Sequence, residues 1–146
     1  MYKTMILVGI FLFSTTSFAL GGDVTVTIMD AQKSDATIRI QMFGAQHEGA
    51  WDENALDNVT PIAQQFSPVK EGGTRFVFTD ISDGMYALRF FEDQNDNETL
   101  DSNLLGMPQE PFGFSNDARG FAGPPSFQDA SFLVSGNTAI TATLEP

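Results

Sequence analysis

Oxygen-bearing side chains occupy every second position of one short segment in the middle of the chain. Residues 92–101 hold five acidic residues and no lysine or arginine. The alternating set consists of Asp93, Asn95, Asn97, Thr99 and Asp101. Calcium takes about six to eight oxygens from carboxylates, amides, backbone carbonyls and water. The spacing therefore predicts that this segment folds around Ca²⁺, with these five residues as ligands.

The segment follows the ligand order of an EF-hand loop in part. Asp93, Asn95 and Asn97 fall at its first, third and fifth positions. Thr99 offers its backbone carbonyl at the seventh position, and Asp101 is the ninth. No helix is expected on either side, so we predict a static site with a dissociation constant of about 10⁻⁴–10⁻³ M, as in extracellular modules.

Two residues depart from the EF-hand order. Glu98 stands at the sixth position, where glycine makes a sharp turn, and a positive φ there costs about 1–2 kcal/mol. Leu104 stands at the twelfth position and has no ligating oxygen. A closing ligand would have to come from elsewhere, and the nearby candidates are Glu92, Asp96, Ser102, Asn103 and Glu110.

A metal-free explanation of the same segment exists. Aspartate and asparagine side chains accept hydrogen bonds from nearby backbone N–H groups, and a solvated ladder of such turns needs no cation. Against it stands charge repulsion, because two carboxylates about 4 Å apart repel by about 1 kcal/mol in water and more at a protein surface. We therefore favour calcium over the empty ladder and over magnesium, which demands stricter geometry.

The first residues have the pattern of an export signal. Lys3 precedes an apolar run over residues 5–13, and Ser17 and Ala19 are small residues at the positions that a signal peptidase reads. The run is too short to span a membrane, which takes about 20 residues. We predict cleavage after Ala19, a single mature domain over residues 20–146, no membrane span after cleavage, and a periplasmic or secreted location.

Composition excludes some partners and some sources of stability. The formal net charge is −12, and the loss of Lys3 with the signal makes it −12 − 1 = −13. A surface this acidic repels nucleic acid, which is not an expected partner. The chain has no cysteine, so a packed core, with or without a metal, must stabilise it in place of disulfides.

Alternation of apolar and polar residues dominates the rest of the chain and predicts strands. The segments with this pattern are 24–28, 37–42, 75–78, 86–91, 131–134 and 139–144. We predict an all-β fold, a single antiparallel β-sandwich of Greek-key, immunoglobulin-like or prealbumin-like type with one long ordered loop. A short helix near 52–58, capped by Asp52, is also expected.

The predicted long loop runs from Asp93 to about Gln128. Loops of this length are uncommon and are usually functional or held down. The apolar residues expected to anchor it are Leu104, Leu105, Met107, Phe112, Phe114, Phe121 and Phe127.

Several motifs in fixed order resemble one bacterial family. They are Gly84-x-Tyr86-Ala87, Asp93-x-Asn95-x-Asn97-x-x-Leu100-Asp101, Leu105-Gly106-Met107-Pro108, Gly113-Phe114-Ser115-Asn116 and Gly123-Pro124-Pro125-Ser126-Phe127. Together they are similar to the exported domain-of-unknown-function family numbered twenty-one forty-one. The chain departs from the family pattern at Glu98, usually Gly, and at Glu92, usually His. The resemblance implies a small exported β-sandwich and no assigned activity.

Catalytic residues are not evident. His47 is the only histidine, no cysteine is present, and no Ser-His-acid set follows from the sequence. We predict that the chain is not an enzyme. It is expected to be an exported β-sandwich, stabilised by Ca²⁺, with a binding or structural role at the cell envelope. Its partner is unknown, and a glycan is one candidate.

Two alternatives remain open. A glycan hydrolase would need Glu92 or Asp101 to face Glu110 across a cleft at about 5–10 Å. A carbohydrate-binding module would instead expose Trp51, Phe112 or Phe121 as a flat aromatic strip.

Overall fold

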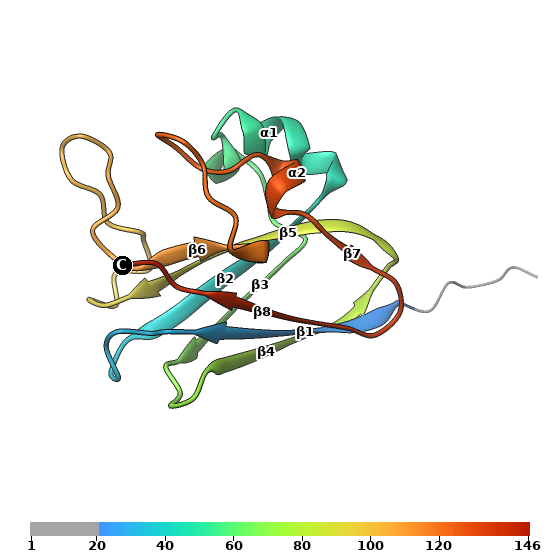
Figure 1. The fold of residues 1–146 in the computed structure, drawn as a ribbon, viewed down its shortest axis with the longest axis horizontal. Helices are drawn as coiled ribbons and strands as arrows, with labels where there is room; N and C mark the ends of the chain where they lie inside the picture. Colours follow the sequence, from blue (N-terminus) through green and yellow to red (C-terminus); the bar gives the residue numbers. More distant parts are fainter. Residues whose placement is uncertain (1–20) are drawn as a thin grey trace, which may run out of the picture.

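The computed structural model describes residues 21–146, which form two packed β-sheets with short helices at one end (Figure 1). The predicted signal peptide, residues 1–19, lies outside the described residues. Within the described part of the chain, no helix combines the length and apolarity needed to cross a membrane. The predicted all-β class is confirmed as a sandwich-like arrangement of two sheets.

The first sheet has three strands in the order β4-β1-β8. They are β1 (Gly22–Met29), β4 (Thr74–Ile81) and β8 (Thr138–Thr143). Strand β1 is antiparallel to β4 but parallel to β8, with Val26 opposite both Phe76 and Ile140. The prediction of a purely antiparallel sandwich was therefore wrong.

The parallel pair has a topological cause. Strand β7 (Phe132–Val134) pairs with β5 (Gly84–Asp93) in the other sheet, and residues 135–137 then lead the chain into β8, beside β1. Because β7 and β8 belong to different sheets, they do not form a hairpin. The direction of β8 is therefore not tied to an antiparallel partner next to it in sequence.

The second sheet has five strands, with β3-β2-β5-β6 in order and β7 also paired to β5. Its remaining members are β2 (Thr37–Gly44), β3 (Ala63–Pro68), β5 (Gly84–Asp93) and β6 (Phe112–Phe114). Strand β5 is central because it pairs with β2, β6 and β7. The alternating segments predicted from the sequence all fall on strands of these two sheets.

The main core lies between the sheets and is built by alternation. In β1 the residues Val24, Val26 and Ile28 are buried, while the intervening residues are exposed or half-buried. From the second sheet, Ile40 and Leu88 meet them in the same cluster. Burying an aliphatic or aromatic side chain of this size is worth about 1.5–3 kcal/mol, so the two-residue period is what stabilises the sandwich.

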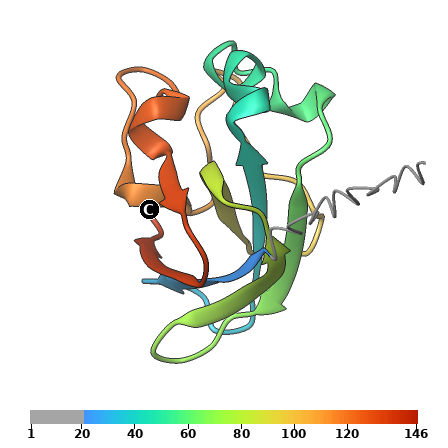
Figure 2. The same ribbon diagram turned by 90° about the vertical axis from the view of Figure 1, so that its right-hand side faces the viewer.

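A second, smaller core lies on the opposite side of the five-stranded sheet. Helices α1 (Glu48–Asp52) and α2 (Phe127–Ala130) lie close together at one end of the molecule (Figures 1 and 2). Trp51 is 1% exposed, and its indole N–H donates to the Pro125 carbonyl at 2.9 Å. The cluster consists of Phe43, Trp51, Leu56, Ala87, Phe127 and Ala130. We call these residues and their helices the helical cap.

The helix predicted at 52–58 is displaced toward the N-terminus. Asp52 ends α1 instead of capping a helix, and only a 3₁₀ turn, Leu56–Asn58, follows it. The Asp52 carboxylate accepts a hydrogen bond from the Phe127 N–H at 2.7 Å. Asp52 thus serves the start of α2, distant in sequence, which local pattern did not indicate.

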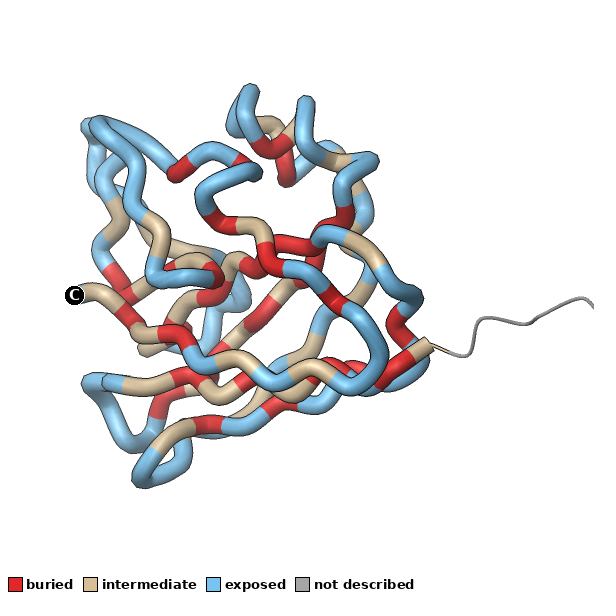
Figure 3. The backbone as a smooth tube through the Cα atoms, turned by 45° about the vertical axis from the view of Figure 1, so that its right-hand side comes forward, coloured by how far each residue is buried: buried red, intermediate tan, exposed pale blue. Residues whose placement is uncertain are grey.

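The segment between β5 and β6 is mostly exposed, as the tube in Figure 3 shows. The apolar residues predicted to anchor the long loop divide into two groups. Leu104, Leu105, Met107 and Phe121 are exposed, Phe112 and Phe114 are half-buried, and Phe127 is buried. Anchoring by the first group was wrongly predicted. Polar contacts of Glu110 and Asn103 hold the segment between β5 and β6, which contains Leu104, Leu105 and Met107.

Candidate functional site

The loop at residues 93–101 is a chain of side-chain-capped turns. Asn95 Oδ1 accepts from the Asn97 N–H at 3.2 Å, and Asn97 Oδ1 accepts from the Thr99 N–H at 2.9 Å. Asp96 and Glu98 have φ values of 59° and 66°. These two left-handed residues curl the backbone. Glu98 therefore adopts the turn conformation that glycine provides in an EF-hand, at the cost expected for a residue with a Cβ.

The curled backbone brings three of the five predicted ligands together. Asp101 accepts hydrogen bonds from the side-chain amides of Asn95 at 2.6 Å and Asn97 at 2.9 Å, one on each carboxylate oxygen. A half-turn of either amide about its last torsion would present oxygen in place of nitrogen, at the loss of the hydrogen bond that this oxygen accepts from the Asn97 or Thr99 N–H. The same three side chains therefore have the donor chemistry and the proximity that a hard cation requires.

Asp93 lies at the base of the loop with its side chain fully buried. Its carboxylate accepts from Arg39 Nε at 2.7 Å and from the backbone N–H groups of Asn97 at 3.1 Å and Glu98 at 2.9 Å. Burial acts to raise the pKa of Asp93, but the hydrogen bonds from Arg39 and from the two N–H groups outweigh it and lower the pKa below 3.8. Asp93 is therefore ionised at neutral pH.

Comparison with protein families identifies the chain. The sequence model described as "Uncharacterized protein conserved in bacteria (DUF2141)" matches residues 26–141. The chain belongs to this family. The match covers both sheets, the loop and the helical cap, and it confirms the resemblance seen in the motifs. Comparisons with curated proteins and with solved structures found no match.

Two buried glutamates hold the neighbourhood of the loop in this DUF2141 domain. Glu110 accepts from the Gln94 N–H at 2.8 Å and from the Asp101 N–H at 3.1 Å, and so ties the two ends of the loop together. Glu92 accepts from the N–H groups of Gln32 at 2.8 Å and Lys33 at 2.6 Å. Both are buried, with 6% exposure for Glu110 and 0% for Glu92.

These contacts bear on two sequence-based ideas. The sequence offered Glu92 and Glu110 as closing ligands or as a pair of catalytic acids. Both oxygens of each carboxylate are engaged by N–H groups, which makes the pair an anchor for backbone. The sequence held no signal for this role, because the burial of the two glutamates is visible only in the structure. The sequence did not reveal which N–H groups each glutamate binds.

The DUF2141 loop offers a donor set of low charge. Across residues 21–146, no three His, Cys, Asp or Glu side chains are grouped so as to hold a metal ion. Of the predicted ligands, Asp101 supplies a carboxylate and Asn95 and Asn97 supply amides. Both carboxylate oxygens of Asp93 already accept hydrogen bonds from Arg39 and from backbone N–H groups. Leu104, at the twelfth position, is fully exposed. Such a set suits calcium only if carbonyl and water oxygens complete the shell, which corresponds to weak binding.

The aromatic strip suggested for a carbohydrate module does not form from the residues proposed. Trp51 is buried in the helical cap, whereas Phe121 is fully exposed and Phe112 is half-buried. His47 packs edge-on against Phe43 with ring centroids 5.7 Å apart, and its Nδ1 accepts from the Gly44 N–H at 3.3 Å. His47 is therefore part of the same cap.

Proposed function

We propose that the mature chain is an exported, non-catalytic module whose loop at residues 93–101 binds Ca²⁺, and that it binds a partner or has a structural role at the cell envelope. The export signal in residues 1–19 supports the location. Within the sandwich-like class, the two sheets suit a Greek-key arrangement of the immunoglobulin-like or prealbumin-like kind. Both carboxylate oxygens of Glu92 and of Glu110 accept hydrogen bonds from backbone N–H groups, which supports a non-catalytic role.

The observation that carries the calcium proposal is the convergence of the Asn95 and Asn97 side chains on the Asp101 carboxylate. Four acidic residues lie within this loop. Arg39 contacts Asp93, and its guanidinium lies 3.6 Å from Asp96 and 3.4 Å from Glu98. Asp101 is contacted by neutral amides. A divalent cation between these oxygens would offset the excess negative charge and hold the turns.

Thermal unfolding of the purified mature protein tests this proposal. We expect the melting temperature to rise with millimolar Ca²⁺, to rise less with Mg²⁺, and to fall with EDTA. With a dissociation constant of about 10⁻⁴–10⁻³ M, Ca²⁺ at about 1 mM adds about 0.4–1.4 kcal/mol of stability, and about 2.7 kcal/mol requires about 10–100 mM Ca²⁺. Equilibrium dialysis with radioactive calcium provides the direct measurement at this weak affinity.

Matched variants separate the site from general charge effects. Asp101→Asn keeps the size of the side chain but removes a carboxylate, so it should abolish the calcium response. Asp35→Asn removes an exposed charge whose ion pair, with Lys33, lies outside the loop, and its response should match the wild type. A flat calcium titration, or equal responses in both variants, contradicts the proposal.

Export is tested separately by the intact mass of the protein recovered from an exporting host. The expected mass lacks residues 1–19. Protein that stays in the cytoplasm with its first residues attached would contradict export without touching the calcium site.

A further inference from the structure

The outer face of the five-stranded sheet is only half covered. The helical cap lies over Phe43 and Ala87, which are opposite each other on β2 and β5. Farther along the same strands, Gln41 and Arg39 take the positions on this face and are half-buried. The covered end is buried and aromatic, whereas the other end presents polar side chains to solvent.

At the open end, the register of β3, β2 and β5 places their side chains in two rows across the three strands. Arg39 is opposite Phe66 on one side and Phe91 on the other. Gln41 is opposite Gln64 and Arg89 in the same way. Because paired residues on neighbouring strands point to the same side of a sheet, these six side chains form one surface. We call it the open face.

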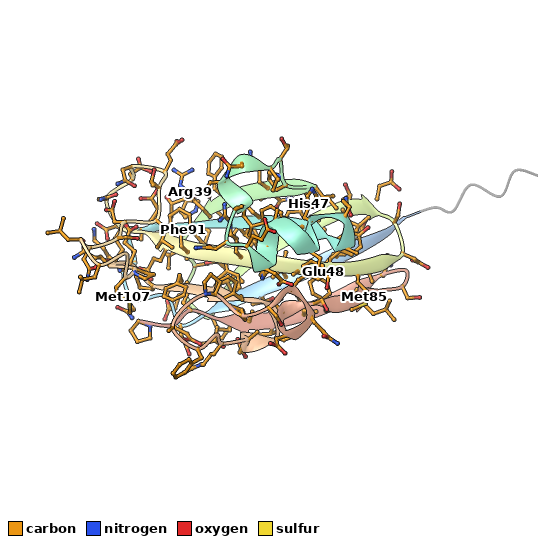
Figure 4. All side chains as sticks on the ribbon, turned by 90° about the horizontal axis from the view of Figure 1, so that it is seen from above. Arg39, His47, Glu48, Met85, Phe91 and Met107 are labelled. Atoms are coloured by element: carbon orange, nitrogen blue, oxygen red, sulfur yellow. The ribbon has the colours of Figure 1, made fainter. Side chains whose placement is uncertain are left out.

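The open face is hollowed into a groove of about 670 Å³, within the range of small-molecule sites. Its floor is the sheet, and Glu98 of the 93–101 loop borders one end. Figure 4 shows Arg39 and Phe91 near one another, away from His47 and Glu48 of the cap.

The groove combines an aromatic surface with planar hydrogen-bonding groups. Phe66 is 70% exposed, and the Arg39 guanidinium lies over its ring at 5.4 Å. The Arg89 Nε–H donates to Gln41 Oε1 at 2.7 Å, so the two side chains are held in place before any ligand arrives. A single exposed phenylalanine is ordinary. An exposed ring beside a fixed row of amides and guanidiniums is a surface suited to an amphipathic ligand.

Charge decides between neutral and anionic ligands. Arg39 is bonded to Asp93 at 2.7 Å, and Arg89 is bonded to Asp57 at 2.9 Å. The positive charges of both arginines are thus balanced by carboxylates, in a chain whose net charge is −12. An anionic ligand would gain little attraction here and would meet long-range repulsion. A neutral ligand avoids both problems and can still use the remaining N–H donors of the arginines.

Backbone pairing decides against an extended peptide. A peptide strand binds a sheet by hydrogen bonds along an exposed edge. Strands β2 and β5 in the groove floor are each paired on both sides, whereas β3 is the edge strand of this sheet. A peptide strand added to β3 would extend the sheet beside the groove and would not lie on its floor. Recognition on this face must therefore come from side chains. A sugar ring suits such a surface because it has an apolar C–H face for an aromatic ring and a rim of hydroxyls for amides and guanidiniums.

We propose that the open face binds a neutral oligosaccharide, with one sugar ring stacked on Phe66 and hydroxyl groups hydrogen-bonded by Gln41, Gln64 and Arg89. This inference rests on the binding role proposed above, but it does not require that the loop binds calcium. It names the class of partner that the module takes.

Affinity electrophoresis in native gels tests the inference. The gels contain one soluble neutral polysaccharide each, namely mixed-linkage β-glucan, galactomannan, xylan or dextran, and a separate gel contains polygalacturonate as the anionic comparison. We expect the mature protein to be retarded by at least one neutral polysaccharide and not by polygalacturonate. Calorimetric titration with the matching oligosaccharide then measures the affinity.

Two phenylalanine variants supply the matched comparison. Phe66→Ala should weaken binding at least tenfold, because it removes the stacking surface. Phe121→Ala removes a ring that is fully exposed but lies outside the groove, and it should bind as the wild type does. Both positions are at the surface, so both variants should fold.

Three results would overturn the inference. They are free migration in every neutral gel, retardation by polygalacturonate alone, and equal retardation of Phe66→Ala and the wild type. The same gels run with EDTA separate the two proposals. If retardation persists without calcium, the groove binds the polysaccharide even when dialysis finds no calcium binding. If the protein binds calcium but is not retarded, the calcium site is supported and sugar binding by the groove is ruled out.

Discussion

The two ends of the outer sheet face are made by the same strands and yet differ in chemistry. On β2, Phe43 is fully buried under the helical cap, while Arg39, four residues earlier on the same face, is half-buried beside the groove. On β5, Ala87 and Phe91 show the same contrast. One sheet therefore carries a second core at one end and a candidate binding surface at the other.

The two ends also differ in what their contacts contribute to stability. Trp51 contacts three aromatic rings edge-on, with centroids 5.7–5.9 Å apart from Phe43, Phe114 and Phe127. Such pairs add about 0.5–1.5 kcal/mol each to the effect of burial. At the open end, the pair of Arg89 with the exposed Asp57 is worth at most about 1 kcal/mol. The capped end stabilises the fold, and the open end is free to serve binding.

Among substitutions that test this contrast, the largest loss of stability is expected at the capped end. Trp51→Ala should lower the free energy of unfolding by about 3–5 kcal/mol, because it removes a buried ring and leaves a cavity. Urea denaturation measures the change. A loss below about 1 kcal/mol would mean that the cap is not a second core.

An intermediate effect is expected at the border of the open end. Arg39→Met should cost about 2 kcal/mol, because the buried carboxylate of Asp93 loses a charged hydrogen-bond donor but keeps its two backbone N–H partners. Urea denaturation at neutral pH gives the value. A variant as stable as the wild type would show that this ion pair contributes nothing to the fold.

At acidic pH, the difference in unfolding free energy between the wild type and Arg39→Met should decrease. The folded-state pKa of Asp93 is below its ordinary value of 3.8, so its ionised form stabilises the fold above that value. The contribution is lost as the pH falls through 3.8 toward the lower folded-state pKa. The gap in stability between the wild type and Arg39→Met should therefore narrow from about pH 5 downward. A gap that stays constant to the acid limit would contradict the role given to Asp93.

The smallest effect on stability is expected within the groove. Phe66→Ala should change the free energy of unfolding by no more than about 0.5 kcal/mol, because the ring is 70% exposed. Thermal and urea unfolding measure it. A loss above about 1.5 kcal/mol would assign Phe66 to the fold and would weaken the case that the open end is reserved for a ligand.

Much of the fold was predictable because strand patterning is local. Val24, Val26 and Ile28 share a face whatever lies opposite, since side chains alternate along any strand. The oxygen spacing from Asp93 to Asp101 was equally visible, and the structure brings Asn95, Asn97 and Asp101 together. Binding of calcium there stays a prediction.

Partner choice was not predictable, because it depends on contacts between residues far apart in the chain. Nothing near β8 specifies that it runs parallel to β1, and nothing near Asp52 points to the Phe127 N–H, 75 residues away. The exposed Leu104 and Leu105 were expected to be anchors. Glu110 anchors the loop in their place, because its buried carboxylate accepts hydrogen bonds from the backbone N–H groups at both ends of the loop.

The sequence by itself determined which residues alternate into strands, which segment gathers oxygens and which family the chain resembles, because each depends on neighbours within a few positions. The tertiary structure decided which half of the sheet is covered. Residues 48–52 and 127–130 meet over Phe43 although strands β3 to β6 lie between them in the sequence. These two helices do not reach the open face around Arg39 and Phe66, which therefore stays uncovered.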